Sequence, residues 1–204
     1  RISPTVSPPP NRADAMAPAP LHRRRCLQQL GGAAAWLSAT LAARQVQAAQ
    51  DLDPRALGHL APWPPGKARP ELKALALDGQ LRSLADYAGA PLILNFWASY
   101  CAPCRLEMAQ FNRLLEQYRP QSLRVLAVNH GEMPARVLQF LQTVPFHGEA
   151  LLDRSQTQLP AWGGIALPTS FVLDAQGQVR LWHVGEIDWL GPRAQAQLAA
   201  VLRG

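Results

Sequence analysis

The feature that most constrains this 204-residue chain is a pair of thiols placed between an apolar run and a helix-like segment. Residues 91–97 form an apolar run typical of a strand buried on both faces, and residues 102–118 have helical spacing. Cys101 and Cys104 lie at the junction. Because a helix start favours an anion, a thiolate at Cys101 would be stabilised there, and Cys104 is close enough to form a disulfide with it. The junction indicates a redox-active dithiol.

The cysteine count and the neighbouring residues argue against several other roles for the Cys101–Cys104 pair. The chain has three cysteines, and the third, Cys26, lies in a segment that we expect to be removed. A structural zinc site needs four Cys or His ligands, and no second pair with that spacing is present. A c-type haem needs His after the second Cys, where this chain has Arg105. A static disulfide remains an alternative, although so small a loop constrains the unfolded chain little. We therefore predict no metal and no cofactor.

The first 70 residues divide into three parts. Residues 1–15 are rich in Pro, Ser and Ala, and we interpret them as a disordered or untranslated leader. Residues 16–49 contain basic, apolar and small-residue regions in the order of an export signal, with an uncleaved membrane anchor as the alternative. Residues 50–70 are rich in Pro and predict a linker or an extended arm. We therefore expect residues 71–204 to fold in the periplasm, either free or held to the membrane by the N-terminal segment.

The charge of the chain comes mainly from its N-terminal part. The formal net charge is +6, and residues 1–49 contain six Arg and one Asp. The remainder carries a net charge near +1. The basic character is therefore no indication of nucleic-acid binding.

The pattern of the remaining sequence predicts a single α/β domain. A Ser-Leu-Ala-Asp sequence at 83–86 predicts one helical turn. The order of elements predicts a mixed β-sheet with helices on both faces and an N-terminal β-hairpin extension. The expected strands are 71–77, 80–83, 91–97, 123–129, 150–153, 169–173 and 178–184, and the expected helices are 102–118, 134–143, 155–162 and 192–202.

Three separated motifs, Leu94–Glu107, Val125–Asn129 and Leu167–Asp174, resemble those of the thioredoxin fold. More narrowly, they are similar to the TlpA/ResA-like (DsbE-like) exported thiol–disulfide oxidoreductases. The resemblance covers residues 71–203 and implies a thioredoxin-like fold and a protein-disulfide reductase. It implies no cofactor beyond the dithiol. Its expected partners are protein disulfides, with apocytochrome c as one candidate client, and a membrane thiol electron donor.

The dithiol and one carboxylate are the expected catalytic groups. Cys101 would attack a substrate disulfide, and Cys104 would resolve the mixed disulfide by forming the Cys101–Cys104 bond. Glu107 lies three residues after Cys104 on the same helix face, and it matches an active-site Glu of the resembled group. Burial near the sulfurs would raise its pKa, so that it could relay a proton to or from Cys104.

Substrate binding is expected beside the dithiol. Pro168 matches the family's cis proline, which would expose the backbone of Leu167 for pairing with an extended substrate segment. Tyr100 stands where the group usually has Trp, and Tyr100 and Trp162 are expected to border the dithiol as an apolar docking surface.

Two other functions remain open. A thiol peroxidase of the peroxiredoxin type would use Cys101 in a site with Thr and Arg and would need a separate resolving cysteine, whereas here Ser99 and Arg105 flank an adjacent pair. A non-enzymatic copper-binding module would use both thiolates and a third ligand such as Met108 or His130. The direction of electron transfer also stays open, because oxidases and isomerases use the same dithiol at other potentials.

Overall fold

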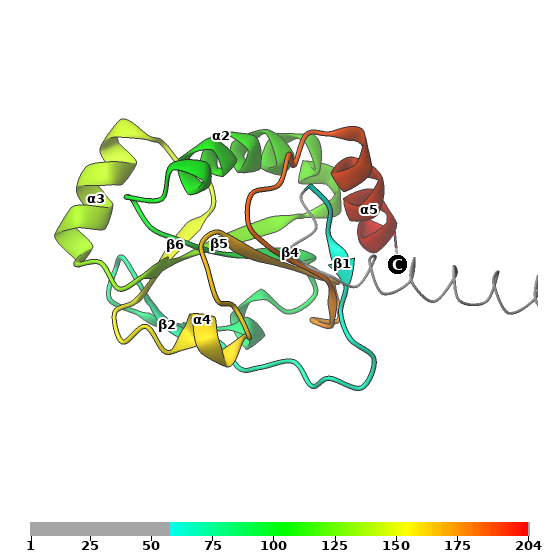
Figure 1. Cartoon of the computed structure of the whole chain (residues 1–204), viewed down its shortest axis with the longest axis horizontal. Coiled ribbons are helices and arrows are strands. Elements are labelled where there is room, and N and C mark those ends of the chain that lie inside the picture. The colour runs from blue at the N-terminus through cyan, green and yellow to red at the C-terminus, as the bar shows by residue number, and fades with distance from the viewer. Residues whose placement is uncertain (1–57, 204) are drawn as a thin grey trace, which may run out of the picture. The chain divides into compact units, whose positions relative to one another are not determined.

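The computed structural model of this protein describes residues 58–203 (Figure 1). The predicted leader, the predicted export signal with Cys26, and the start of the predicted linker lie outside the described residues. The strands are β1 (Ala61–Pro62), β2 (Lys73–Ala76), β3 (Leu81–Ser83), β4 (Leu92–Trp97), β5 (Arg124–His130), β6 (Glu149–Asp153), β7 (Thr169–Leu173) and β8 (Val179–Val184). The helices are η1 (Leu84–Tyr87), α2 (Ala102–Gln117), η2 (Arg119–Gln121), α3 (Pro134–Thr143), α4 (Gln158–Ala161) and α5 (Pro192–Leu202).

The strands form one mixed sheet in the order β1-β8-β7-β4-β5-β6-β2-β3. Strand β5 pairs in parallel with β4 and with β6. Strands β7 and β8 form an antiparallel hairpin, and β7 pairs antiparallel with β4. The β2–β3 hairpin joins the far side through β2 and β6. The structure therefore confirms the predicted thioredoxin-like α/β fold.

Local sequence signals explain where several elements begin. Helices α3 and α5 start at Pro134 and Pro192, where the fixed φ of proline suits a first helical position. Gly79 has φ +83° in the turn between β2 and β3, which a side chain would strain. The hydroxyl and backbone N–H of Ser83 both donate to the carboxylate of Asp86, which fixes the single turn η1.

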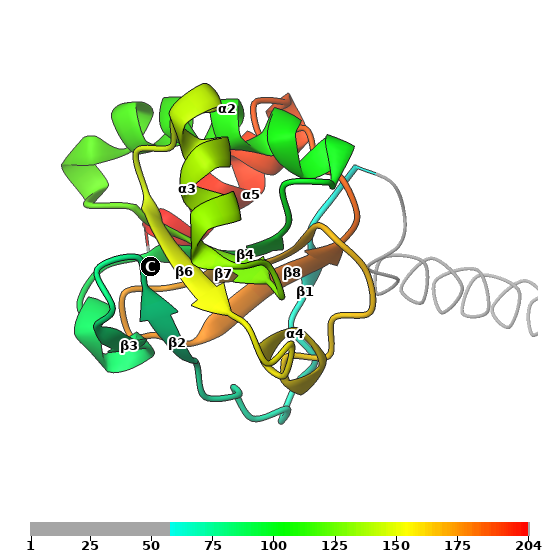
Figure 2. The same cartoon turned by 90° about the vertical axis from the view of Figure 1, so that its left-hand side faces the viewer.

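The central strand β4 separates two apolar layers. All six of its residues are buried, and alternate side chains point to opposite faces of the sheet. Leu94 and Phe96 pack into the core on one face, and Ile93 and Trp97 pack on the other. Figure 2 shows α2, α3 and α5 on one face of the sheet and α4 on the other. Helices therefore cover both faces, as the sequence predicts.

The last part of the predicted linker docks on the domain. Strand β1 pairs with β8, and Trp63 packs edge-on against Phe171 and Trp182 with ring centroids 5.8 and 5.9 Å apart. The indole N–H of Trp63 donates to the carbonyl of Lys67. The extended arm is thus part of the sheet and covers the face opposite α2.

Helix α2 buries one face and leaves one large apolar side chain exposed. Leu106 is 61% exposed. The buried stripe consists of Cys104, Glu107, Met108, Phe111 and Leu114. Leu106 is five residues before Phe111, which places it about 140° around the helix from that residue. Leu106 therefore lies outside the buried stripe, which includes the polar Glu107 in place of an apolar residue.

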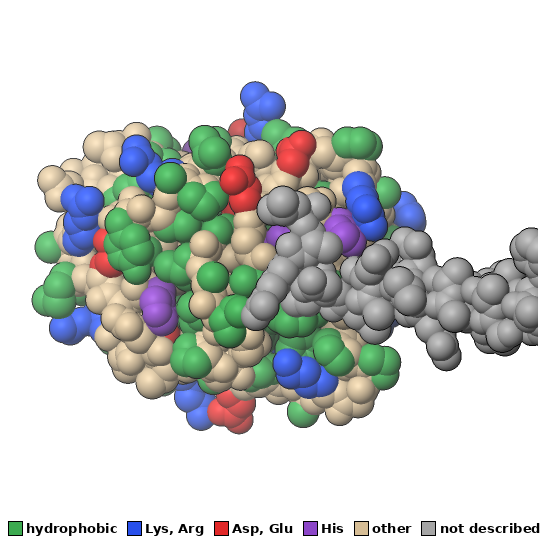
Figure 3. Space-filling view, viewed as in Figure 1, with side chains coloured by type: hydrophobic (Ala, Val, Ile, Leu, Met, Phe, Trp, Pro, Cys, Tyr) green, Lys and Arg blue, Asp and Glu red, His purple; other side chains and the backbone are tan. Residues whose placement is uncertain are grey.

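The surface carries charges of both signs. Figure 3 shows basic and acidic side chains interspersed on one face of the described residues, with apolar side chains between them. Within residues 58–203, no helix combines the length and the apolar character that a membrane span requires.

Candidate active site

A disulfide joins Cys101 and Cys104 at the start of α2, with their Cα atoms 5.3 Å apart. Cys101 is the N-cap residue, and its sulfur accepts a hydrogen bond from the N–H of Cys104 at 3.3 Å. Pro103 occupies the first turn of the helix, where its missing N–H leaves no donor unsatisfied. Cys101 is 9% exposed and Cys104 is fully buried, so solvent reaches the first sulfur more easily.

The peptide bond between Leu167 and Pro168 is cis, as the resemblance implies. It precedes β7, whose residues pair with β4, the strand that leads to the dithiol. Leu167 is half-buried and packs against the apolar cluster that contains Cys101 and Cys104. The structure therefore brings Leu167 to the two cysteines, and Pro168 is buried directly after it.

Glu107 is buried in the same helix face as Cys104, with 1% of its surface exposed. The amide of Asn95 in β4 donates to one carboxylate oxygen at 3.1 Å, and the backbone N–H of Ile187 donates to the other at 3.1 Å. The Asn95 amide also donates to the hydroxyl of Ser170 in β7. The carboxyl group is thus held between β4 and the segment that follows β8.

Burial raises the pKa of Glu107 to about 8, because a charge is costly away from water. The hydrogen bonds from Ile187 and Asn95 favour the charged form and oppose this rise. The indole of Trp189 acts in the same direction from beside the carboxyl group, although its N–H lies outside hydrogen-bonding geometry. A carboxyl group that titrates near neutral pH is suited to exchanging a proton with a thiol.

A second carboxylate, which the sequence analysis did not identify, binds the loop that carries Cys101. Glu132 follows β5, and its oxygens accept hydrogen bonds from the N–H and the hydroxyl of Ser99, both at 2.6 Å. The amide of Asn129 donates to the same carboxylate at 2.7 Å. Arg136 in α3 donates to the Ser99 hydroxyl at 3.1 Å. This set of four side chains is called the Ser99 clamp below.

The charge of Glu132 is well stabilised. Burial alone would raise its pKa, but the hydrogen bonds from Ser99 and Asn129 and the charge of Arg136 outweigh burial and lower the pKa. One signal could have identified this residue in the sequence. Strands β4 and β5 are parallel, so the residues after their carboxyl ends meet at one edge of the sheet, and Glu132 follows β5 as Ser99 follows β4.

The structure separates the two aromatic residues expected beside the dithiol. Tyr100 is 70% exposed next to Cys101, so it remains available to a partner. Trp162 is fully buried against Phe96 and Phe171, and its indole N–H donates to the carbonyl of Glu71. It lies in the core on the face opposite α2, so its predicted place in the docking surface was wrong.

Metal-ligating groups do not gather at this site. No group of three or more His, Cys, Asp or Glu side chains among residues 58–203 could hold a metal ion. Met108 is buried in the same cluster as both cysteines, but His130 lies beside Asp153, with 3.9 Å between Nδ1 and Oδ2.

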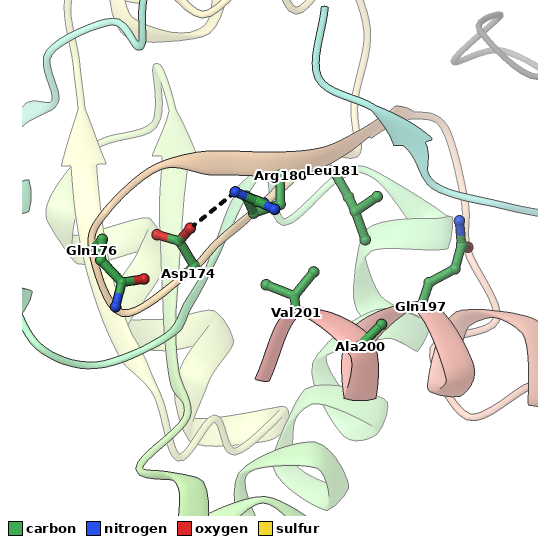
Figure 4. A pocket seen from close by; sticks show the side chains of 7 residues that line it. All are labelled: Asp174, Gln176, Arg180, Leu181, Gln197, Ala200 and Val201. Carbon is green, nitrogen blue, oxygen red and sulfur yellow. Dashed lines mark ion pairs between the residues drawn. The ribbon is translucent and has the colours of Figure 1, made fainter. Parts of the chain in front are cut away.

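A cavity of about 400 Å³ lies elsewhere, between the β7–β8 turn, β8 and α5 (Figure 4). Arg180 and Asp174 form an ion pair in it, with 3.6 Å between nitrogen and oxygen. Leu173, just before Asp174, pairs with Leu92 at the start of β4, whereas Cys101 follows the end of β4. The cavity is therefore at the opposite end of the sheet from the dithiol and takes no part in this site.

The sheet order, the cis proline before β7 and the disulfide at the head of α2 together define a thioredoxin-fold protein with a cysteine-pair site. The model of the AhpC/TSA family matches residues 65–182, and the chain belongs to this family.

Known relatives support the narrower resemblance. The chain is 36% identical to the thiol-disulfide oxidoreductase ResA of Geobacillus thermodenitrificans and 35% identical to that of Geobacillus kaustophilus, each over 115 residues. Each match covers 56% of this chain and 66% of the relative, slightly less than two thirds of its length.

A solved structure described as a thiol:disulfide interchange protein DsbE from Chlorobium tepidum is also similar. It is 30% identical with a TM-score of 0.61, and the match covers 65% of this chain and 94% of that chain. The expected likeness to the ResA and DsbE group is confirmed.

Proposed function

We propose that this protein is a thiol–disulfide oxidoreductase that reduces protein disulfides through Cys101 and Cys104. The observation that carries the proposal is a disulfide at the head of α2, packed with Leu167 of the cis Leu167–Pro168 bond. The likeness to ResA and DsbE proteins supports the same chemistry.

The reaction begins with the reduced pair. The Cys101 thiolate attacks one sulfur of a substrate disulfide, forms a mixed disulfide, and releases the other substrate sulfur as a thiolate that takes up a proton. Cys104 then loses its proton and attacks the sulfur of Cys101. The Cys101–Cys104 disulfide forms, the second substrate thiol leaves, and two electrons have passed to the substrate. A membrane thiol electron donor restores the dithiol.

Glu107 is the proposed acceptor of the Cys104 proton. Its pKa of about 8 makes both of its protonation states accessible near neutral pH, which a proton relay requires. Cys104 is fully buried, so an internal acceptor on the same helix face replaces solvent.

The substrate is expected to dock as an extended segment. The backbone of Leu167 would pair with it beside the buried Pro168, and the exposed ring of Tyr100 would contact its side chains. Periplasmic protein disulfides are the proposed substrates, with apocytochrome c as one candidate client. Residues 16–49 would direct export and provide the only membrane contact if they stay attached.

The alternatives have less support. A thiol peroxidase of the expected type needs a distant resolving cysteine, whereas Cys101 is bonded to its neighbour Cys104. A copper-binding module would bind Cu(I) tightly and show little turnover, whereas a reductase turns over disulfide substrates without metal.

A trapping experiment tests the proposal. In Cys104→Ala the resolving step is lost, so mixed disulfides should accumulate through Cys101, and mass spectrometry of the adducts would identify the client. Cys101→Ala is the matched control and should give few adducts. Adducts in Cys101→Ala but not in Cys104→Ala would reverse the roles of the two cysteines, and none in either variant would refute the exchange mechanism.

A further inference from the structure

The loop between β4 and α2 places Cys101, and the Ser99 clamp determines where that loop lies. Ser99 is 3% exposed, and both of its donors bind the carboxylate of Glu132. Its hydroxyl oxygen also accepts a hydrogen bond from Arg136. Asn129 holds Glu132 in place, because its amide oxygen accepts from the backbone N–H of Glu132 at 3.1 Å. The loop is thereby joined to β5 and to α3.

The clamp also places a fixed negative charge near the thiol. Glu132 contacts Ser99, which lies two residues before Cys101. Because two residues of extended backbone span only a limited length, the Glu132 carboxylate lies within about 11 Å of the Cα of Cys101. The side chain of Glu132 is 11% exposed, and that of Arg136 is 57% exposed. Water therefore screens the positive partner more strongly than the negative one.

Other titratable side chains lie on the elements that carry or contact the dithiol. Glu107 on α2 is largely neutral at pH 7, because its pKa is raised to about 8 by burial. Glu186 lies near Glu107, beyond β8. Arg105 is exposed on the first turn of α2, with its guanidinium 5.9 Å from the ring centre of Phe140. On the β5–α3 side of Cys101, the carboxylate that contacts the loop is the half-buried Glu132.

We propose that Glu132 is a positioning residue that holds the Cys101 loop through Ser99. Its negative charge disfavours the Cys101 thiolate, and the positive charge of Arg136 opposes this effect. This inference rests on the proposed function and gives a reason why electrons would pass from the dithiol to the substrate. Reduction of the Cys101–Cys104 disulfide takes two electrons and two protons, and Cys101 then releases a proton to solvent to become a thiolate. A charge that disfavours the thiolate destabilises the reduced form relative to the disulfide, which makes the dithiol a better reductant.

Two variants that remove charges of opposite sign test the proposal. Glu132→Gln removes the negative charge and keeps an acceptor for Ser99, whereas Arg136→Gln removes the positive charge. The full chain is reduced, and the rate of iodoacetamide adduct formation at Cys101 is measured by peptide mass spectrometry at pH 6 and pH 7. At an effective dielectric constant of about 20, two unit charges roughly 10 Å apart change an ionisation equilibrium about 16-fold without salt, and screening over one Debye length at about 0.1 M ionic strength reduces this to about threefold. Glu132→Gln should therefore alkylate about threefold faster and Arg136→Gln about twofold slower.

Three controls separate charge from loosening of the loop. Glu116→Gln makes the same charge change at the far end of α2 on an exposed residue, and should leave the rate unchanged. In 1 M salt the difference between Glu132→Gln and the wild type should shrink, because screening weakens a charge effect but not a loosened loop. Thermal unfolding of each variant reports whether it folds.

Rates that rise in both charge variants, or that change in neither, would overturn the inference. Arg136 is exposed, so Arg136→Gln is expected to fold and decides the sign even if Glu132→Gln does not. The assay needs no client protein. A failure to reduce protein disulfides would refute the proposed function without affecting this result.

Discussion

Replacing Glu107 with Gln should flatten the pH dependence of the protein's stability. The pKa of Glu107 is raised from 4.5 to about 8 by burial, so the folded state keeps a proton that the unfolded state releases in this range. The stabilisation is fully present below pH 4.5 and is lost as the pH rises through 8. The free energy of unfolding of the wild type should therefore fall between pH 5 and pH 8.

The size of the effect follows from the shift. Each pKa unit corresponds to about 1.4 kcal/mol, so the wild type should lose roughly 3 to 4 kcal/mol between pH 5 and pH 8 through this group. The amide of Gln has one oxygen for the two donors, Asn95 and Ile187, that bind different oxygens of Glu107. The unpaired donor adds a cost of about 1 to 3 kcal/mol that does not depend on pH.

The assay is urea unfolding of the oxidised protein at pH 5, 6, 7 and 8. The wild type should be more stable than Glu107→Gln at pH 5, and the difference should shrink or reverse by pH 8. Glu116→Gln is the matched control, because Glu116 is exposed on the same helix, and it should follow the wild type. If the difference between Glu107→Gln and the wild type is the same at pH 5 and pH 8, burial does not keep the carboxyl protonated, and Glu107 is excluded as a neutral-pH proton relay.

Three stability predictions concern the fold. Phe171→Ala should lower the free energy of unfolding by about 3 to 5 kcal/mol in urea titrations, because this ring is fully buried among Trp63, Trp162 and other aromatic side chains. Leu106→Ala should change it by less than about 0.5 kcal/mol, because Leu106 is 61% exposed, and a larger loss would place that side chain in the core. Asp86→Ala should cost about 1 kcal/mol in thermal or urea unfolding, because Asp86 accepts both hydrogen bonds that fix η1, and an unchanged stability would contradict that role.

The sequence predicted the parts of the fold that depend on local signals. Helices α3 and α5 have the predicted bounds, because proline marks their first residues and helical periodicity continues to their ends. The buried strand β4 and the dithiol at the head of α2 were also predicted, since a strand covered on both faces is apolar throughout.

Features that depend on tertiary contacts were harder to predict. Strand β1 has only two residues, and its pairing with β8 gives no local pattern. Trp162 opens the segment Trp162-Gly163-Gly164 that leads to the cis proline, yet its ring packs on the face of the sheet opposite α2. Glu132 is an acidic residue in a loop, and only the parallel pairing of β4 and β5 brings it to Ser99.

The central claim is that the Cys101–Cys104 pair carries two electrons to a protein disulfide. The most direct measurement mixes the reduced, metal-free protein with a disulfide-bonded protein substrate and counts both products by mass spectrometry after alkylation. The account predicts that one Cys101–Cys104 disulfide forms for each substrate disulfide that is lost. A substrate that keeps its disulfide while the dithiol persists would contradict it.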